Sequence, residues 1–294
     1  MNKRSNDNQE VITSLHLPEK KEFPLSLDLL NSRALLGALL KHGNIIVRGD
    51  ELCAERFRDI TDSFTASYSL EPKRRYSDSG EASRVDDIGS ENDKSINLHS
   101  EASFSPSWPR IITFYSSEKS DIPTDIADGT TIWNQLKPST REFFCVNPVV
   151  YDLALDLSSW TKKLPRGVRD IPSSSPGVRD MKIDGDRKIM YAKVSRYAVH
   201  ETPDGNIAFS NHIFHSPAEP QILSMLTVDN KPYPLARFKE EVSNVYKKIA
   251  VPFLWEKNSL MILDNRRMMH GRFMKTPIEA ASRVKVLSSI RLKI

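Results

Sequence analysis

A histidine and a glutamate stand two positions apart, at His99 and Glu101, and together they could bind a metal ion. In an extended segment, side chains two positions apart point to the same face, so both groups could reach one ion. A third ligand must come from elsewhere. His270 is the candidate, because it follows the apolar run 260–263 and a polar stretch. Two histidines and one carboxylate form the facial triad of non-haem Fe(II) oxygenases, so the pattern suggests that kind of metal site. The alternative is that His99 and Glu101 are ordinary surface residues.

Zinc is the alternative metal, because catalytic zinc sites also use two histidines and a glutamate. The sequence contains no His-Glu-x-x-His motif, so the signature of the zinc proteases is absent. Arg283, 13 residues after His270, favours iron. An arginine there can bind a carboxylate through two parallel hydrogen bonds, as the tail of 2-oxoglutarate requires. A solvated arginine at the end of a strand is the alternative interpretation of Arg283.

The elements that must position these residues follow from hydrophobic periodicity. Leucines at helical spacing before Gly43 predict a helix over 28–41, and Asp50 opens a second helical pattern. Two further helices are predicted at 133–144, with a start or break near Pro138, and at 234–250. Apolar and β-branched runs predict strands at 44–48, 110–115, 189–200, 207–214, 260–263 and 284–292. The turn 203–206 should join the third and fourth of these strands into a hairpin.

Two stretches without periodicity predict long loops. Residues 70–95 are polar and charged, and residues 164–187 hold three prolines, three glycines and a run of three serines. No linker separates two hydrophobic cores. We therefore expect a polar N-terminal segment at 1–26 and one domain at 27–294, with 164–187 as a loop insertion.

Composition excludes several classes of protein. With 294 residues and 39% hydrophobic content the chain can build a buried core, and its 42 basic and 38 acidic residues leave a net charge of only +4. Nucleic acid is therefore not an expected partner. No apolar stretch approaches the ~20 residues that cross a bilayer. The two cysteines, Cys53 and Cys145, exclude a disulfide scaffold, so we expect a cytoplasmic protein.

Four ordered segments carry a family resemblance. Residues 98–110 combine His-x-Glu with an aromatic and Trp-Pro-Arg, and residues 123–128 read Pro-Thr-Asp-Ile-Ala-Asp. Residues 208–215 contain a Phe-x-Asn strand, and residues 263–272 read Leu-Asp-Asn-Arg-Arg-Met-Met-His-Gly-Arg. This order resembles the TauD/TfdA family of Fe(II)/2-oxoglutarate-dependent oxygenases, particularly its branch of amino-acid hydroxylases that includes syringomycin aspartyl hydroxylase and clavaminate synthase.

The resemblance implies an α+β fold, a double-stranded β-helix (jelly roll) with helices outside it. It also implies the cofactors Fe(II) and 2-oxoglutarate, with O2 as cosubstrate. The positions that match the family's functional residues are the iron ligands His99, Glu101 and His270, the 2-oxoglutarate contacts Thr124 and Arg283, and the substrate-mouth residue Arg84. Three features depart from the family: Asp121-Ile122 replaces a glycine pair, Val284 replaces an aromatic residue, and the insertion at 164–187 has no counterpart.

The expected reaction is hydroxylation of an aliphatic carbon of an amino acid, free or bound to a carrier protein, in specialised metabolism. Desaturation, epoxidation or cyclisation of another small molecule is the alternative, since all begin with the same hydrogen abstraction. A non-catalytic jelly-roll binding protein is a further alternative. Three further histidines are numerous enough to suggest another metal site, but packing in the core or a place at the end of a hairpin is the expected role: His200, His212 and His215. Arg267 could meet a substrate carboxylate or be solvated.

Overall fold

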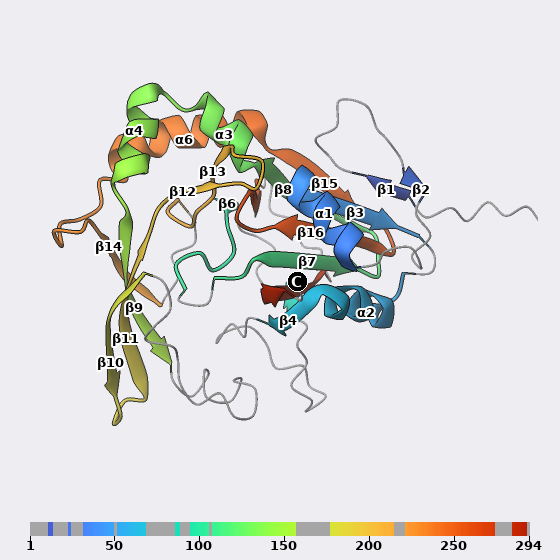
Figure 1. The fold of residues 1–294 in the computed structure, drawn as a ribbon, viewed down its shortest axis with the longest axis horizontal. Helices are drawn as coiled ribbons and strands as arrows, with labels where there is room; N and C mark the ends of the chain where they lie inside the picture. Colours follow the sequence, from blue (N-terminus) through green and yellow to red (C-terminus); the bar gives the residue numbers. More distant parts are fainter. Residues whose placement is uncertain are drawn as a thin grey trace, which may run out of the picture.

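Among the described residues of the computed structural model, antiparallel strands account for more of the chain than helices do. The described residues are 11–13, 23–24, 32–49, 52–68, 86–88, 95–105, 108–156, 177–214, 221–273 and 284–292. Figure 1 shows the strands in two packed layers with helices outside them and a third sheet that extends to one side.

Two sheets form the centre of the fold. The larger has the order β2 (Phe23–Pro24), β1 (Val11–Thr13), β3 (Asn44–Arg48), β16 (Ser259–Asp264), β7 (Ile111–Ser116), β18 (Val284–Leu292) and β4 (Thr65–Tyr68), with β5 (Asp86–Ile88) also paired to β18. The smaller has the order β15 (Val251–Trp255), β8 (Ser120–Asp128), β17 (Met268–Arg272) and β6 (Ile96–His99). The chain changes sheet at every step of β6–β7–β8 and of β15–β16–β17–β18. This is a double-stranded β-helix, and it confirms the expected α+β fold.

Side chains from both sheets meet in a buried cluster between them. Its members are Ile46, Ile112, Phe114, Ile126, Phe253, Trp255, Met261, Leu263 and Met268. Because strand side chains alternate, Met268 lies in this inner cluster while Met269 lies in the cluster on the outer face of the smaller sheet. His270 therefore faces inward with Met268.

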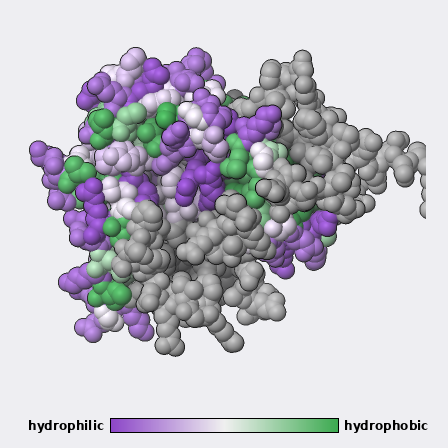
Figure 2. Space-filling model, viewed as in Figure 1, coloured by the Kyte–Doolittle hydropathy of each residue, from purple (hydrophilic) through white to green (hydrophobic). Residues whose placement is uncertain are grey.

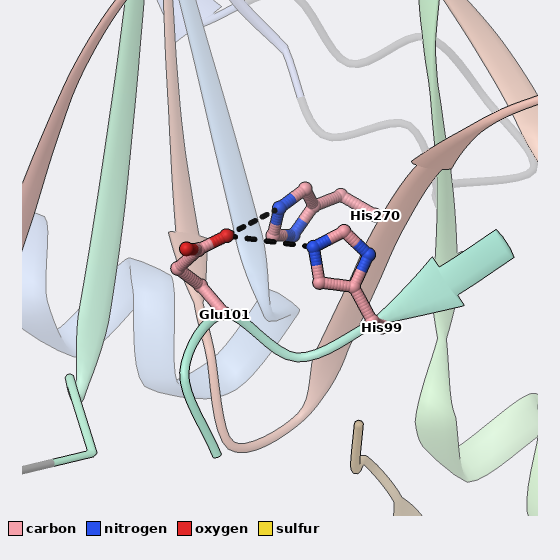
Figure 3. A group of neighbouring side chains, drawn as sticks. All are labelled: His99, Glu101 and His270. Atoms are coloured by element: carbon pink, nitrogen blue, oxygen red, sulfur yellow. Dashed lines mark ion pairs between the residues drawn. The ribbon is translucent and has the colours of Figure 1, made fainter. Parts of the chain in front are cut away.

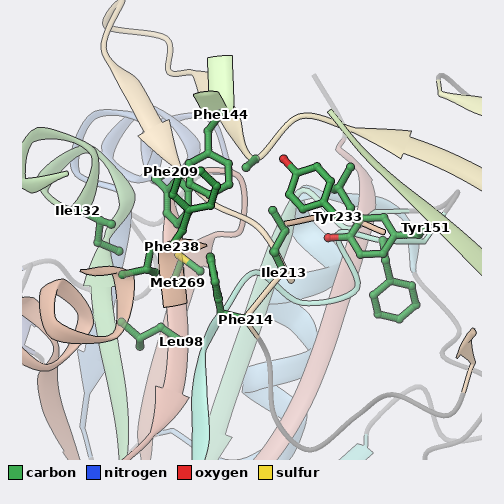
Figure 4. Packing of buried hydrophobic residues seen from close by; sticks show 14 of the residues in the cluster. Leu98, Ile132, Phe144, Tyr151, Phe209, Ile213, Phe214, Tyr233, Phe238 and Met269 are labelled. Atoms are coloured by element: carbon green, nitrogen blue, oxygen red, sulfur yellow. The ribbon is translucent and has the colours of Figure 1, made fainter. Parts of the chain in front are cut away.

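Helices cover the outer faces of both sheets. α1 (Ser32–His42) and α2 (Ala54–Phe64) bury leucine and phenylalanine side chains against the larger sheet. α3 (Gly129–Gln135), α4 (Pro138–Val146) and α6 (Ala236–Ile249) belong to the cluster outside the smaller sheet. Figure 4 shows its centre, where Phe144, Phe209 and Phe238 surround Met269.

A long insertion between β8 and β15 builds the rest of the molecule. It contains α3, α4, α6 and a sheet of four strands in the order β10 (Val178–Asp184), β11 (Ile189–Arg196), β9 (Val149–Asp156) and β14 (Ile222–Leu226). It also contains the hairpin β12 (Val199–Glu201) and β13 (Ile207–Phe209). The four-stranded sheet projects from the roll in Figure 1.

The helices differ from expectation mainly at their ends. α1 runs to His42 and ends at Gly43, whose φ of 79° suits glycine. α2 begins at Ala54, and the Cys53 side chain caps it by accepting a hydrogen bond from the Arg56 N–H. The predicted helix 133–144 is two helices, α3 and α4, because Pro138 starts a new helix at its first position.

Two strand predictions were wrong in part. The predicted strand 189–200 breaks after Arg196, so β11 pairs with β9 and β10 while β12 alone forms the hairpin with β13. The predicted partner 207–214 ends at Phe209, because the next residues bond to the loop after β6, as in the hydrogen bond from Ser100 N–H to Asn211 O. Within the predicted loop 164–187, residues 178–184 form β10, held by pairing with β11. The rest of that loop up to residue 176 lies outside the described residues, as does most of 70–95.

Exposed large hydrophobic side chains are dispersed over the surface. They are Val146, Ile183, Tyr197, Leu223, Val228 and Leu254. On the face drawn in Figure 2 hydrophobic residues form small patches among hydrophilic ones. Among the described residues, no helix is long and apolar enough to cross a membrane.

Candidate metal site

His99 and His270 lie directly opposite each other on neighbouring strands. β6 and β17 are antiparallel, and their register pairs His270 with His99. Cross-strand partners point to the same face, and the two ring centroids are 4.4 Å apart. Gly271 makes this close pairing possible, because a Cβ there would lie 2.6 Å from the Ile96 carbonyl oxygen.

Glu101 completes a three-ligand group from the turn that follows β6. Its Oε2 atom is 3.4 Å from Nε2 of His99 and 3.4 Å from Nε2 of His270 (Figure 3). Ligand atoms of the three residues all lie within 4.8 Å of one another, and no other such group occurs in the described part of the chain. The structure thus brings together the three predicted ligands, although His270 is 171 residues from His99 in sequence.

Asn265 fixes the backbone of Glu101. The Asn265 Oδ1 atom accepts a hydrogen bond from Glu101 N–H at 2.8 Å, and its Nδ2 donates to Glu101 O at 2.9 Å. Nδ2 also donates to Pro109 O at 3.0 Å, and Ser100 Oγ donates to Oδ1 at 3.2 Å. These bonds use the full capacity of a side-chain amide. The sequence motif contained this residue, but local patterns gave no indication of its long-range contacts.

The protonation state of His270 suits metal binding. Burial, together with the neighbouring His99, lowers the pKa of His270 to about 4 against the opposing effect of Glu101. His270 is therefore neutral at pH 7, as a metal ligand must be. Nδ1 of His99 lies 3.0 Å from Asn97 O and can donate to it, which leaves the Nε2 lone pair directed at Glu101.

The spacing of the ligand atoms fits a shared ion. Two atoms bound about 2.1 Å from one metal lie about 3.0 Å apart at octahedral angles and about 3.4 Å apart at tetrahedral angles. The observed 3.4 Å separations fall in this range and permit either iron or zinc. Two imidazoles and a carboxylate are a donor set for both metals. The residues present therefore fit the expected iron.

Thr124, the predicted 2-oxoglutarate contact, faces the same side of the smaller sheet as His270. The register pairs His270 with Ile126, and Thr124 lies two residues before Ile126 on β8. Nε1 of Trp255 donates a hydrogen bond to Thr124 Oγ1 at 2.9 Å. This contact fixes the hydroxyl and leaves its hydrogen to donate. Trp255 was not predicted from the sequence as a site residue.

The arginines have different outcomes. Arg283 and Arg84 lie outside the described residues, so their roles stay predictions. Arg267 is not a solvated residue: its side chain is 11% exposed, and its Nη2 atom donates a hydrogen bond to Asp128 Oδ2 at 2.7 Å. It also donates to Lys41 O, so it joins α1 to the start of α3.

Two of the other histidines lie near the site but outside the ligand group. The His212 ring packs edge-on against His99 at 5.1 Å, and its Nδ1 atom lies 3.3 Å from Ser100 O. His200 packs on Trp108, with ring centroids 4.5 Å apart. Both pack against aromatic rings, as expected. His215 lies outside the described residues.

Comparison with solved structures shows the same fold over nearly the whole chain. A taurine dioxygenase from Burkholderia xenovorans has a TM-score of 0.60 and 14% identity, covering 97% of this chain and 90% of that one. PvcB from Pseudomonas aeruginosa has a TM-score of 0.57 and 13% identity, covering 100% and 99%. AAD-2, solved with Mn(II) and N-oxalylglycine, has a TM-score of 0.54 and 12% identity, covering 92% and 90%.

Comparison with family models identifies the family of this chain, whereas comparison with individual curated proteins does not. No curated protein sequence matches the chain significantly. The model of the taurine catabolism dioxygenase TauD, TfdA family matches residues 13–283, which include all three residues of the metal group. The chain therefore belongs to the TauD/TfdA family of dioxygenases.

Proposed function

We propose that the protein is an Fe(II)/2-oxoglutarate-dependent oxygenase that hydroxylates an aliphatic carbon of an amino acid or peptidyl intermediate in specialised metabolism. The observation that carries the iron assignment is the convergence of His99, Glu101 and His270 on one point at the inner face of the smaller sheet. Family membership supports the same chemistry. AAD-2 was solved in complex with Mn(II) and N-oxalylglycine, so one protein of this fold binds both a divalent metal and a small dicarboxylate.

Each site residue has a defined task in this proposal. His99, Glu101 and His270 hold Fe(II). The Thr124 hydroxyl, fixed by Trp255, donates a hydrogen bond to 2-oxoglutarate. When iron and 2-oxoglutarate are bound, they supply oxidation of a C–H bond by O2, with 2-oxoglutarate converted to succinate and CO2.

The 2-oxoglutarate tail needs a cation, and we assign it to Arg283. This assignment rests on the family pattern and on the spacing of Arg283 from His270. A guanidinium can bind the distal carboxylate through two parallel hydrogen bonds, which a lysine cannot reproduce.

Two features support the substrate class and the outcome. Glu101, Phe104 and the Trp-Pro-Arg sequence at 108–110 resemble the amino-acid hydroxylases more than the taurine enzymes, which have aspartate in place of Glu101. Glu101 also fills the third protein position on the metal. A halide would need that position vacant, so no halogenation is expected.

The test is incubation with Fe(II), ascorbate, 2-oxoglutarate and a panel of free and carrier-bound amino acids, followed by mass spectrometry. The expected product is heavier than its substrate by one oxygen, and succinate should form with it. A product lighter by two hydrogens would indicate desaturation instead. Turnover of sulfonates or fatty acids, with no response to any amino acid, would contradict the substrate class.

Glu101→Ala tests the metal assignment, with Glu142→Ala on the exposed side of α4 as the matched control. Glu101→Ala should lose Fe(II) binding and succinate formation, while Glu142→Ala should keep both. Full succinate production by Glu101→Ala under limiting iron would contradict the triad. Activity with Zn(II) and none with Fe(II) would replace iron by zinc in the assignment.

A further inference from the structure

The segment that follows β13, residues 210–214, lies against the strand and turn that carry two of the metal ligands. β6 is the last strand of the smaller sheet, so one of its edges has no strand beside it among the residues that the structure describes. The segment bonds to this region instead. Asn97 Nδ2 donates a hydrogen bond to Phe214 O at 2.8 Å, and Ser100 N–H donates to Asn211 O at 2.8 Å. The segment therefore helps to hold the part of the backbone from which His99 and Glu101 project.

His212, in the middle of this segment, contacts the metal group in two ways. Its side chain is buried, and its Nδ1 atom lies 3.3 Å from Ser100 O. A carbonyl oxygen can only accept a hydrogen bond, so Nδ1 carries a hydrogen and donates it. The ring of His212 also stands at 88° to the ring of His99, with centroids 5.1 Å apart, and lies 4.8 Å from the ring of Phe104. One residue thus packs on a ligand side chain and bonds the next peptide group.

Ser100 matters because it separates the ligands His99 and Glu101, so its backbone conformation sets how the two side chains are placed. Two groups donate to its carbonyl oxygen. Ser103 N–H does so at 3.4 Å, but it belongs to the same turn. Within the described part of the chain, the bond from His212 is the one that ties this oxygen to another element of the fold.

His212 is not itself a member of the ligand group, which consists of His99, Glu101 and His270. Groups that do not bind a metal but orient its ligands typically change metal affinity by about 10- to 100-fold when they are removed. The bond from Ser100 N–H to the segment joins two backbone groups, so it persists whatever side chain is present. The bond from His212 depends on the residue type, and a substitution can remove it.

We propose that His212 is a positioning residue of the metal site: its Nδ1–H holds Ser100 O, and thereby keeps the turn between His99 and Glu101 in the conformation that binds the metal. The proposal rests on the proposed function for the presence of a metal, and on the contacts of His212 for the role of this side chain. It requires the hydrogen-bond donor at Nδ1, with the ring as a secondary contribution.

The experiment separates the donor from the ring. His212→Phe keeps an aromatic ring and removes the donor. His212→Asn keeps a donor, because the amide nitrogen is the same number of bonds from Cα as Nδ1, and it removes the ring. Tyr233→Phe is the matched control: it removes one side-chain donor of a buried aromatic residue, the hydroxyl that bonds Asn147 O at 2.7 Å, in the cluster outside the smaller sheet. The Kd for Mn(II) is measured by equilibrium titration of each folded protein.

His212→Phe should bind Mn(II) about tenfold or more weakly than the wild type, whereas His212→Asn should recover most of that loss and Tyr233→Phe should show none. The visible absorption spectrum of each Co(II)-loaded protein reports the coordination geometry. It should change in His212→Phe and return toward the wild-type spectrum in His212→Asn. A residue that only fills space would lower the free energy of unfolding without this pattern. His212→Leu, also without a donor, replaces His212→Phe if that variant does not fold.

Equal Mn(II) affinity in the wild type and the donor-free variant would overturn the proposal. So would equal losses in His212→Phe and His212→Asn, because the ring or a direct bond to the metal would then be responsible. Wild-type protein that binds Mn(II) but forms no succinate with any compound would count against the proposed function and leave the role of His212 intact. Wild-type protein that binds neither Mn(II) nor Co(II) would overturn both.

Discussion

Replacing Asn265 by alanine should displace Glu101 while His99 and His270, the two ligands on strands, keep their positions. The side chain is fully buried, and its four hydrogen bonds reach Glu101 N–H, Glu101 O, Pro109 O and Ser100 Oγ. Alanine removes all four and leaves His99 and His270 paired through β6 and β17. The perturbation therefore acts on the position of Glu101.

The magnitude follows from the groups left without partners. Asn265→Ala leaves one buried donor, Glu101 N–H, and two carbonyl acceptors, Glu101 O and Pro109 O, without their hydrogen-bond partner. Each unsatisfied buried polar group costs about 1 to 3 kcal/mol, so the free energy of unfolding should fall by about 3 to 5 kcal/mol after partial relaxation. Loss of a contact that orients a ligand typically weakens metal binding by about 10- to 100-fold, and we expect that range here.

The assay compares Asn265→Ala with Asn211→Ala. Asn211 is also buried, and its side chain bonds Ala198 O and Ile213 N–H, with no bond to Glu101. Both variants should lose stability in urea titrations, but only Asn265→Ala should lose Mn(II) or Fe(II) affinity in equilibrium titrations of the folded protein. Asn265→Asp, which keeps the acceptor and removes the donor, should also bind metal weakly. If Asn265→Ala and Asn211→Ala bound metal with equal affinity, the reasoning would be refuted.

Three further predictions follow from other contacts. Gly271→Ala places a methyl group 2.6 Å from the Ile96 carbonyl oxygen, so it should push β6 from β17 and lower both stability and metal affinity; an unchanged Mn(II) Kd would show that the strands can separate without moving the histidines. Arg283→Ala should weaken 2-oxoglutarate binding by a factor of tens or more at nearly constant iron affinity, and equal 2-oxoglutarate affinity would move the role elsewhere. The pKa of His200 is about 3 in the folded state against 6.5 ordinarily, so the unfolded chain takes up a proton first as pH falls and stability drops from pH 6.5 toward pH 3. His200→Gln should flatten that part of the pH dependence of the free energy of unfolding, and an unchanged slope in urea titrations would contradict the assigned protonation state.

The ligand residues could be predicted because their types and their order can be read directly from the sequence. His-x-Glu and the distant histidine after an apolar strand, together with the family resemblance of the segments around them, predicted the group that the structure brings together. Their meeting was not predictable from periodicity, because it depends on the pairing of β6 with β17 across most of the chain. A glycine at 271, with space for no side chain, is the local sign of that pairing.

The wrong strand predictions have a common physical cause. Hydrophobic patterns report which residues can pair, but hydrogen bonds from elsewhere decide where pairing stops. Ile213 and Phe214 extend the apolar residues of this segment beyond Phe209, yet Asn211 bonds through its carbonyl to Ser100 N–H. β10 shows the opposite case: four of its seven residues are charged and it is largely exposed, as is typical of an edge strand, and only pairing with β11 makes it a strand.

The three ligands depend on two different kinds of constraint. His99 and His270 are held by the strand ladder, whereas the chain leaves the ladder at Glu101, and the next residue, Ala102, has a φ of 49°. A left-handed residue other than glycine costs about 1 to 2 kcal/mol, so the turn needs compensating contacts. The Asn265 amide offers Glu101 one acceptor and one donor, which is what a neighbouring strand would have offered. Glu101 is therefore held as firmly as a strand residue, although the chain turns at this point. The Asn265 side-chain amide makes the two backbone hydrogen bonds that a neighbouring strand would otherwise make.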